Sequence, residues 1–192
     1  SKDYESAMKA ISAAGLDQPT MQGAYQKVAY FRGVQHFNAI QYTAARRLFN
    51  KSLDYPLNNI YAALAHYWLA EIAYREDDFD AALLEINMFE ATPGSATLSE
   101  YRRSLYNKAY AYFSKEDYRN AATTFRLFLN SAKLGKKLAN DAELRLADSY
   151  FMTAQYANAI TYYTTYLGRQ VPDADYAAFQ RSLCYGLVDE PQ

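Results

Sequence analysis

The chain has 192 residues and is 51% hydrophobic, which suits one or two folded domains and is too apolar for a disordered chain. Its formal net charge is −1, which argues against nucleic-acid binding because that class usually carries a basic excess. Cys184 is the only cysteine, so an internal disulfide framework and a cysteine-rich zinc site are excluded, and no apolar run reaches the roughly 18 residues of a membrane span.

Apolar residues recur at helical spacing along the whole chain, and no segment alternates with a period of two. Gly15 is a predicted C-cap, and Pro19 blocks continuation of the first helix. Gly33 costs about 1 kcal/mol inside a helix, so it predicts close approach of another backbone. The ten predicted helices cover residues 3–15, 22–37, 41–54, 59–75, 78–91, 98–114, 117–132, 138–152, 155–167 and 174–187.

Local signals mark several helix ends. Asp77 or Asp78 is the predicted N-cap of helix 78–91. The run from Thr97 to Glu100 is interpreted as a capping box that opens helix 98–114. Gly135, Lys136 and Lys137 are predicted to form a loop.

The helices alternate between two patterns. The second type carries an alanine at a fixed place, and these alanines are separated by 38, 37, 39 and 38 residues: Ala7, Ala45, Ala82, Ala121 and Ala159. The first type carries a small residue 12 positions before the alanine of its partner: Gly33, Ala70, Ala109 and Ala147. Such regularity indicates helical hairpins stacked as a solenoid.

These residues resemble the tetratricopeptide repeat, whose motif combines small and aromatic residues in two paired helices. The matching residues are Gly33, Ala45, Phe49, Ser52 and Pro56; Leu69, Ala70, Ala82, Ile86 and Pro93; Leu105, Ala109, Tyr112, Ala121 and Phe125; and Leu146, Ala147, Tyr150, Ala159 and Tyr163. The period of 37–39 exceeds the family's period of about 34. Long-period repeats of this kind are similar to those of bacterial envelope proteins, which implies a periplasmic or cell-envelope location.

The resemblance implies an all-α, right-handed superhelical solenoid of about ten helices. We expect a single array in which full repeats are flanked by half repeats. The predicted boundaries are 1–20 (half), 21–57, 58–95, 96–134, 135–171 and 172–192 (half). Because both half repeats lack a partner helix, we expect the sequence to be part of a longer polypeptide.

The residues that could bind a metal or take part in catalysis are better explained by structural roles. His36 and His66, the only histidines, have no cluster with metal-ligand spacing, so we expect packing histidines, no metal and no cofactor. A solenoid separates Cys184 from both, which argues against nucleophilic catalysis. The carboxylates at 76–78 and at Asp173 and Asp175 are interpreted as helix caps. Lys133, Lys136 and Lys137 are interpreted as a solvated loop, with an anionic partner as the alternative.

One face of the first-type helices carries aromatic rings two turns apart. In the resembled family this face lines the concave surface. The candidate partner-binding residues are Tyr30, Phe37, Tyr67, Tyr74, Tyr106, Tyr110, Phe113 and Phe151. The alternative is that these rings pack between adjacent first-type helices. The stripe is largely uncharged, so salt is expected to have little effect on binding.

The sequence therefore predicts a scaffold without enzymatic activity that binds a peptide or protein segment in an aromatic-lined concave groove. One rival is a self-associating structural module of a cell-envelope assembly, which would be a homo-oligomer. Another rival is a carbohydrate-binding or enzyme-associated module that stacks sugars on the rings.

Overall fold

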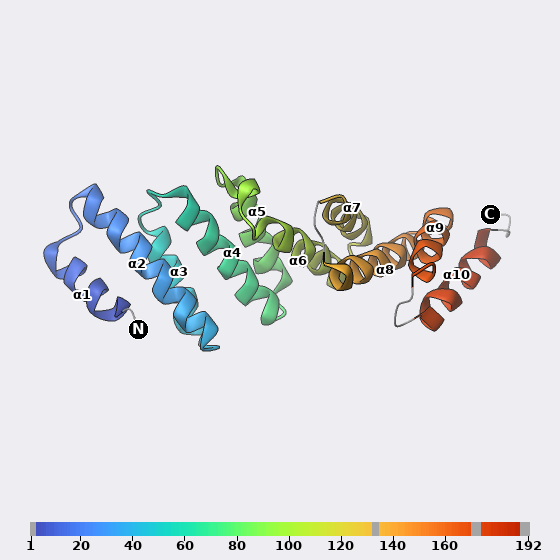
Figure 1. The fold of residues 1–192 in the computed structure, drawn as a ribbon, viewed down its shortest axis with the longest axis horizontal. Helices are drawn as coiled ribbons and strands as arrows, with labels where there is room; N and C mark the ends of the chain where they lie inside the picture. Colours follow the sequence, from blue (N-terminus) through green and yellow to red (C-terminus); the bar gives the residue numbers. More distant parts are fainter. Residues whose placement is uncertain (1–2, 132–134, 170–173, 189–192) are drawn as a thin grey trace. The chain divides into compact units, whose positions relative to one another are not determined.

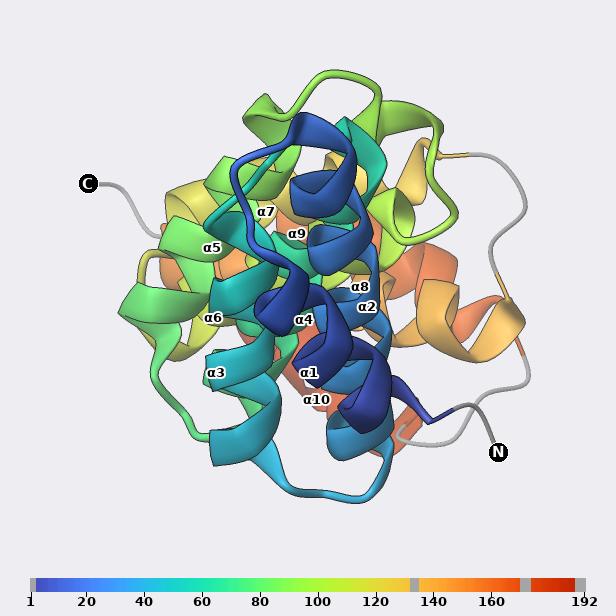
Figure 2. The ribbon, with the colours of Figure 1, turned by 90° about the vertical axis from the view of Figure 1, so that its left-hand side faces the viewer.

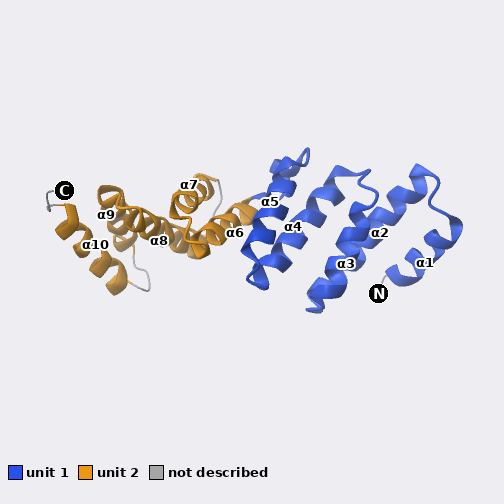
Figure 3. Cartoon of the chain, turned by 180° about the vertical axis from the view of Figure 1, so that it is seen from behind, with its two compact units in different colours: residues 1–101 blue, residues 102–192 orange. Residues whose placement is uncertain are grey.

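The computed structural model describes residues 3–131, 135–169 and 174–188. Across those residues the chain forms ten α-helices, one short 3-10 helix and no strand, which confirms the predicted all-α class. None of these helices combines the length and hydropathy needed to cross a bilayer. The chain divides into two compact units, residues 1–101 and residues 102–192 (Figure 3).

Unit 1 is a row of helices in which each helix packs on the next (Figure 1). Figure 2 is viewed from the side of α1. Its helices are α1 (Tyr4–Ala14), α2 (Pro19–Asn38), α3 (Tyr42–Leu53), α4 (Asn59–Arg75) and α5 (Phe79–Ala91), followed by the 3-10 helix η1 (Ser95–Thr97). The first-type helices α2 and α4 also touch each other. The predicted hairpin arrangement is confirmed in this unit.

Unit 2 continues the same alternation. Its helices are α6 (Tyr101–Ser114, whose first residue closes unit 1), α7 (Tyr118–Leu129), α8 (Lys136–Met152), α9 (Tyr156–Leu167) and α10 (Ala174–Val188). The contacts run α7 to α8, α8 to α9 and α9 to α10. Aromatic pairs join α6 to α7, with Tyr106 lying 5.2 Å from Phe128 and Tyr110 lying 5.3 Å from Phe125 between ring centroids.

The repeated alanines lie inside these hairpins. Ala45, Ala82, Ala121 and Ala159 are all 0% exposed. Steps of three and four residues place each of them on the buried face of its helix, as the sequence predicts. A small side chain at this position lets the paired helices approach closely.

Gly33 has the same role on the first-type helix α2. A Cβ added there would lie 2.7 Å from Cε1 and 2.8 Å from Cδ1 of Phe49 on α3. Phe49 is 0% exposed, and its ring packs against Tyr30 and Trp68. The predicted approach of another backbone is therefore wrong: the group that lies close to Gly33 is the aromatic ring of Phe49.

The turn inside each hairpin has one repeated geometry. A single residue takes the left-handed conformation, with φ between 56° and 60°, at Ile40, Asp77, Glu116 and Ala154. The N–H of the following residue donates to the carbonyl five positions earlier, as from Gln41 to His36 at 2.9 Å, which is a Schellman ending. That following residue is also the N-cap of the second-type helix. The left-handed residue and the N-cap are therefore adjacent, and no further residue separates the two.

Aspartate side chains cap the N-termini of two second-type helices, α5 and α7. Asp78 accepts from the N–H of Ala81 at 3.1 Å, which confirms one of the two predicted caps. Asp117 accepts from the N–H of Asn120 at 3.3 Å in the same way. Asp77 takes the left-handed turn position instead.

Two helices begin three residues away from their predicted starts. The helix predicted from 22 begins at Pro19, where proline lacks only an N–H that would have no helical partner. The helix predicted from 98 begins at Tyr101, because Gly94 has φ 89° and turns the chain into η1. Thr97 Oγ1 donates to the carbonyl of Gly94 at 2.7 Å, so it does not form the predicted capping box. Gly15 does cap α1, with φ 93° and its N–H donating to Ser12.

Candidate functional site

In unit 1 most of the candidate aromatic residues lie in the core. Tyr30, Phe37 and Tyr67 are 7%, 8% and 7% exposed, whereas Tyr74 is half-buried. Phe37 packs on Tyr42 of α3 and Tyr74 on Phe79 of α5, so each ring contacts the partner helix of its own hairpin. These side chains fill the spaces between helices in unit 1.

Trp68 on α4 covers two of these rings. Its ring centroid lies 4.6 Å from that of Phe37, and its Nε1 donates to the hydroxyl of Tyr30 at 3.3 Å. Burial raises the pKa of Tyr30, although this hydrogen bond opposes the shift. An apolar side chain of α4, the next first-type helix, therefore covers the two candidate rings of α2.

In unit 2 the aromatic residues of α6 are more accessible. Tyr106, Tyr110 and Phe113 are all half-buried. The rings of Tyr106 and Tyr110 lie 4.9 Å apart, and Phe113 packs edge-on against Phe125 at 6.4 Å. One side of this three-ring cluster rests on α7, while part of each ring is open to solvent.

A carboxylate on α8 holds the two tyrosines in place. Both hydroxyls donate to the same oxygen of Asp141, Tyr106 at 2.7 Å and Tyr110 at 2.5 Å. Burial and these hydrogen bonds raise the pKa of Tyr110 to about 12 and raise the pKa of Tyr106 further. Both hydroxyls therefore keep their protons at neutral pH and act as donors to Asp141. We call these three residues the tyrosine clamp.

Arg145 lies one turn beyond Asp141 on α8. Its guanidinium lies 5.9 Å from the ring centroid of Phe113 and 2.8 Å from Oδ2 of Asp148. Asp148 is 5% exposed, and its Oδ1 accepts from the hydroxyls of Tyr163 at 2.7 Å and Tyr176 at 3.0 Å. Burial raises the pKa of Asp148, and these donors oppose that shift. A polar network thus extends from the aromatic cluster toward α10.

One repeat position differs in character between α4 and α8. Trp68 and Arg145 both stand two residues before the small residue of their helix, Ala70 and Ala147 respectively. Trp68 packs on the stripe residues of the preceding first-type helix, whereas Arg145 places a charge over the ring of Phe113. Asp141 and Arg145 were not predicted from the sequence, because the aromatic pattern of the first-type helices does not include them. Comparing this position between repeats would have revealed the change.

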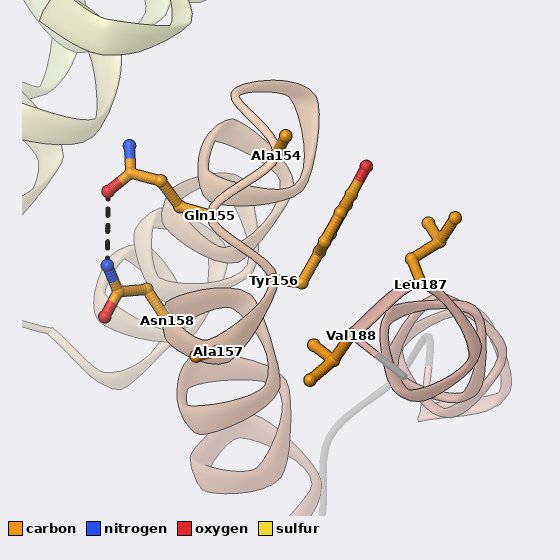
Figure 4. Close-up of a pocket in the computed structure, with 7 residues that line it drawn as sticks. All are labelled: Ala154, Gln155, Tyr156, Ala157, Asn158, Leu187 and Val188. Carbon is orange, nitrogen blue, oxygen red and sulfur yellow. Dashed lines mark hydrogen bonds between the residues drawn. The ribbon is translucent and has the colours of Figure 1, made fainter. Parts of the chain in front are cut away.

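Phe151, the last candidate, is half-buried and packs edge-on against Tyr156 at 5.9 Å. Tyr156 lines an open hollow of about 390 Å³ between the start of α9 and the end of α10 (Figure 4). A second hollow, of about 410 Å³, has Tyr118 at the equivalent position. The lining residues are 154–158 with Leu187 and Val188 in the first, and 116–119 with Met152 and Thr153 in the second. The sequence did not predict this repeated feature.

The remaining candidates make structural contacts. His36 Nδ1 lies 2.5 Å from Oε1 of Gln41 across a hairpin turn, and His66 Nδ1 lies 2.7 Å from Oε2 of Glu85, joining α4 to α5. Both contacts agree with the expected packing role. Within the described ranges no cluster of three or more His, Cys, Asp or Glu could hold a metal ion.

The carboxylates and lysines singled out in the sequence have different structural surroundings. Glu76 pairs with Arg46 of α3, and Asp175 lies in the first turn of α10. Lys136 and Lys137 open α8, so the predicted loop is wrong there; exposed lysines are good helix formers. Lys133 and Asp173 lie outside the described residues.

Comparison with known families agrees with the repeat pattern. A family model described as tetratricopeptide repeat matches residues 33–96 and residues 106–175, together more than half of the chain. The matches begin at Gly33 and at Tyr106, each inside a first-type helix. A search of curated proteins finds no match to the chain.

Proposed function

Because the chain belongs to the tetratricopeptide repeat family, whose repeats generally mediate protein–protein interaction, we propose that unit 2 binds a segment of another protein along α6 and α8. Members of the family are typically non-catalytic scaffolds. The observation that carries the proposal is the tyrosine clamp, in which Tyr106 and Tyr110 are held by Asp141 while their rings stay partly exposed.

Preorganisation explains why the clamp suits binding. A partner that contacts a mobile side chain must restrict its rotamers, at a cost of about 0.5–1.5 kcal/mol for each one. The tyrosines of the clamp are already restricted by hydrogen bonds and by packing on Phe125 and Phe128. Their rings therefore offer rigid apolar surface with little further entropy loss, which is typical of interface hot spots.

The candidate residues divide into two roles under this proposal. Phe113 extends the surface along α6, and Phe151 is a half-buried ring on α8 of the same unit. Tyr74 is half-buried in unit 1 and lies outside the proposed surface. Tyr30, Phe37 and Tyr67 are buried and support the helices of unit 1 rather than meeting a partner. The proposed contact surface is therefore narrower than the eight residues named from the sequence.

Charge beside the rings changes the expected response to salt. Arg145 is about one-third exposed and lies over Phe113, and Asp141 is half-buried beside both tyrosines. A partner seated on this surface meets both signs of charge, so affinity is expected to fall modestly as salt rises. This expectation replaces the salt-independent binding expected from the uncharged aromatic stripe.

The test is selection of binding peptides from a random library on the whole 192-residue chain. Selected peptides are then measured by fluorescence anisotropy against Tyr106→Ala/Tyr110→Ala. Loss of two hot-spot rings predicts weakening by about 2 kcal/mol or more, which is roughly thirtyfold or more in Kd. Tyr112→Ala is the matched control, because Tyr112 lies on the same helix outside the stripe.

Two results would contradict the proposal. Peptides that bind the folded double variant as tightly as the original chain would place the binding surface elsewhere. Oligosaccharides that bind at the clamp while all peptides fail would favour the carbohydrate-binding rival, since aromatic rings also stack on sugars. The cell-envelope location stays a prediction from the sequence.

A further inference from the structure

The guanidinium of Arg145 lies between two carboxylates of the same helix, α8. Asp141 stands four residues before Arg145, and Asp148 stands three residues after it. Side chains three or four positions apart on a helix are neighbours, so either carboxylate can pair with Arg145. In the structure Arg145 pairs with Asp148, with Nη1 lying 2.8 Å from Oδ2. Asp141 instead uses one oxygen to accept from both tyrosines of the clamp.

Burial explains why Arg145 pairs with Asp148. Asp148 is 5% exposed, and a carboxylate so far from solvent needs a cation and further hydrogen bonds to carry its charge. Arg145 supplies the cation, and the hydroxyls of Tyr163 and Tyr176 donate to Oδ1 at 2.7 Å and 3.0 Å. Asp141 is half-buried and already accepts two hydroxyls, so it gains less from the guanidinium.

We propose that Asp148 is a positioning residue for the tyrosine clamp, because its ion pair holds Arg145 away from Asp141. The inference deepens the proposed function, and it rests on that function only where peptide affinity is concerned. A guanidinium prefers to bind a carboxylate through two parallel N–H groups that engage both oxygens. Arg145 paired with Asp141 in this way would compete with Tyr106 and Tyr110 for Oδ2, and the two hydroxyls would lose their acceptor.

The contacts of Arg145 with the aromatic cluster support this role. Its guanidinium lies 5.9 Å from the ring centroid of Phe113, whose ring lies 6.5 Å from that of Tyr110. Burial raises the pKa of Tyr110, and a hydrogen bond from Arg145 opposes that shift. Release of Arg145 from Asp148 would therefore change the surroundings of Tyr110 directly.

A single fluorinated tyrosine at position 110 of the whole 192-residue chain tests this role without any peptide. Its fluorine NMR resonance responds to whether the hydroxyl keeps its carboxylate acceptor. Asp148→Asn removes the charge but keeps a carbonyl oxygen that can accept from Tyr163 and Tyr176, while its amide group turns a second donor toward the guanidinium. We expect Asp148→Asn to move the resonance toward that of free fluorotyrosine.

Removing Arg145 as well gives the sharpest result. In Asp148→Asn/Arg145→Gln no cation competes for Asp141, so the resonance should return close to that of the unchanged chain. An effect of Asp148 on helix packing alone would persist in this double variant. Asp148→Ser also removes the charge and keeps an oxygen acceptor, so it should move the resonance as Asp148→Asn does and provides the test if Asp148→Asn does not fold.

The matched control is Tyr176→Phe. This change removes one donor to Asp148 but leaves the carboxylate charged and paired with Arg145, so the resonance should stay where it is. Tyr176 is 41% exposed, so loss of its hydroxyl is not expected to unfold the chain. Circular dichroism would verify the fold of every variant.

Peptide binding gives a separate measurement that depends on the proposed function. Asp148→Asn should weaken the selected peptides by about twofold to thirtyfold, the usual size of coupling within a side-chain network, and the double variant should recover most of that loss. If the resonance moves as expected while peptide affinity stays the same, the proposed function is contradicted and the role of Asp148 is supported.

Three results would overturn the inference. An unchanged resonance in folded Asp148→Asn would mean that the clamp does not depend on Asp148. Equal shifts in Asp148→Asn and in the double variant would mean that Asp148 acts through packing rather than through Arg145. An equal shift in Tyr176→Phe would mean that loss of any hydrogen bond in the network disturbs the clamp, so that the ion pair has no special role.

Discussion

Replacing Gly33 by alanine tests whether helix propensity or packing decides stability in the first-type helices. In a helix interior, alanine is favoured over glycine by about 0.5–1 kcal/mol because glycine loses more backbone entropy on folding. A Cβ at this position would lie 2.7 Å from Cε1, 2.8 Å from Cδ1 and 3.1 Å from Cζ of Phe49. The propensity gain and the packing cost therefore act in opposite directions.

The packing cost is expected to be the larger of the two. Three ring atoms would meet the new methyl group, and Phe49 is 0% exposed between Tyr30 and Trp68, so its ring has little room to shift. Overpacking of this kind costs about 1–3 kcal/mol. After the propensity gain is subtracted, Gly33→Ala should lower the free energy of unfolding by about 1–2 kcal/mol. In a domain of this size the melting temperature should fall by roughly 2–8 °C.

The matched control is Gly23→Ala in the same helix. A Cβ there would meet only Leu57 Cδ1 at 3.9 Å, which is an ordinary contact, so this change should raise stability by up to about 1 kcal/mol. Thermal and urea unfolding followed by circular dichroism would measure both variants. Adding Phe49→Leu to Gly33→Ala should restore part of the loss. If Gly33→Ala raised the melting temperature as Gly23→Ala is expected to, the packing argument would be wrong.

The other predictions concern three kinds of position. Ala82→Leu and Ala121→Leu should each destabilise the fold by about 1–3 kcal/mol, and thermal melts that leave both unchanged would refute close packing there. Ile40→Gly should stabilise the fold by about 1 kcal/mol in urea unfolding, because Ile40 has φ 60° and is 74% exposed, so little contact is lost; a loss of stability would contradict this. Burial raises the pKa of Glu143, and Arg169 opposes the shift. A raised folded-state pKa stabilises the fold at low pH and loses that contribution as pH rises through the folded-state value, so Glu143→Gln should flatten that part of the stability profile. If the dependence of the unfolding free energy on pH were the same in Glu143→Gln, the raised pKa of Glu143 would be refuted.

Much of the fold could be predicted from the sequence because each repeat reports the same local constraint. The spacing of Ala45, Ala82 and Ala121 reflects a crossing where only a small side chain fits, and that constraint needs no knowledge of distant residues. The helix starts at Pro19 and Tyr101 were misplaced because proline at a first turn and a 3-10 turn depend on neighbouring backbone geometry.

The candidate site was less predictable because the exposure of a ring depends on the helix that follows it. Tyr30 and Tyr106 occupy the same repeat position and are indistinguishable by local pattern. The first is covered by Trp68, whereas the second contributes its hydroxyl to a carboxylate from α8. Periodicity identifies which face a side chain occupies, but its burial depends on the side chains that pack on it. Tyr67 is 7% exposed although the next first-type helix carries Asn107 at the position of Trp68.

The Schellman turns join the two helices of each hairpin with the same backbone geometry, so segments between these turns are structurally interchangeable. The left-handed residue differs at all four turns, being Ile40, Asp77, Glu116 or Ala154, yet its φ varies by only 4° and the same backbone hydrogen bonds recur. The geometry therefore resides in the main chain and tolerates different side chains. A segment that runs from one such turn to the next could be duplicated, deleted or transferred as a cassette without redesign of its ends. Repeat number could then change during evolution while the angle within each hairpin stayed the same.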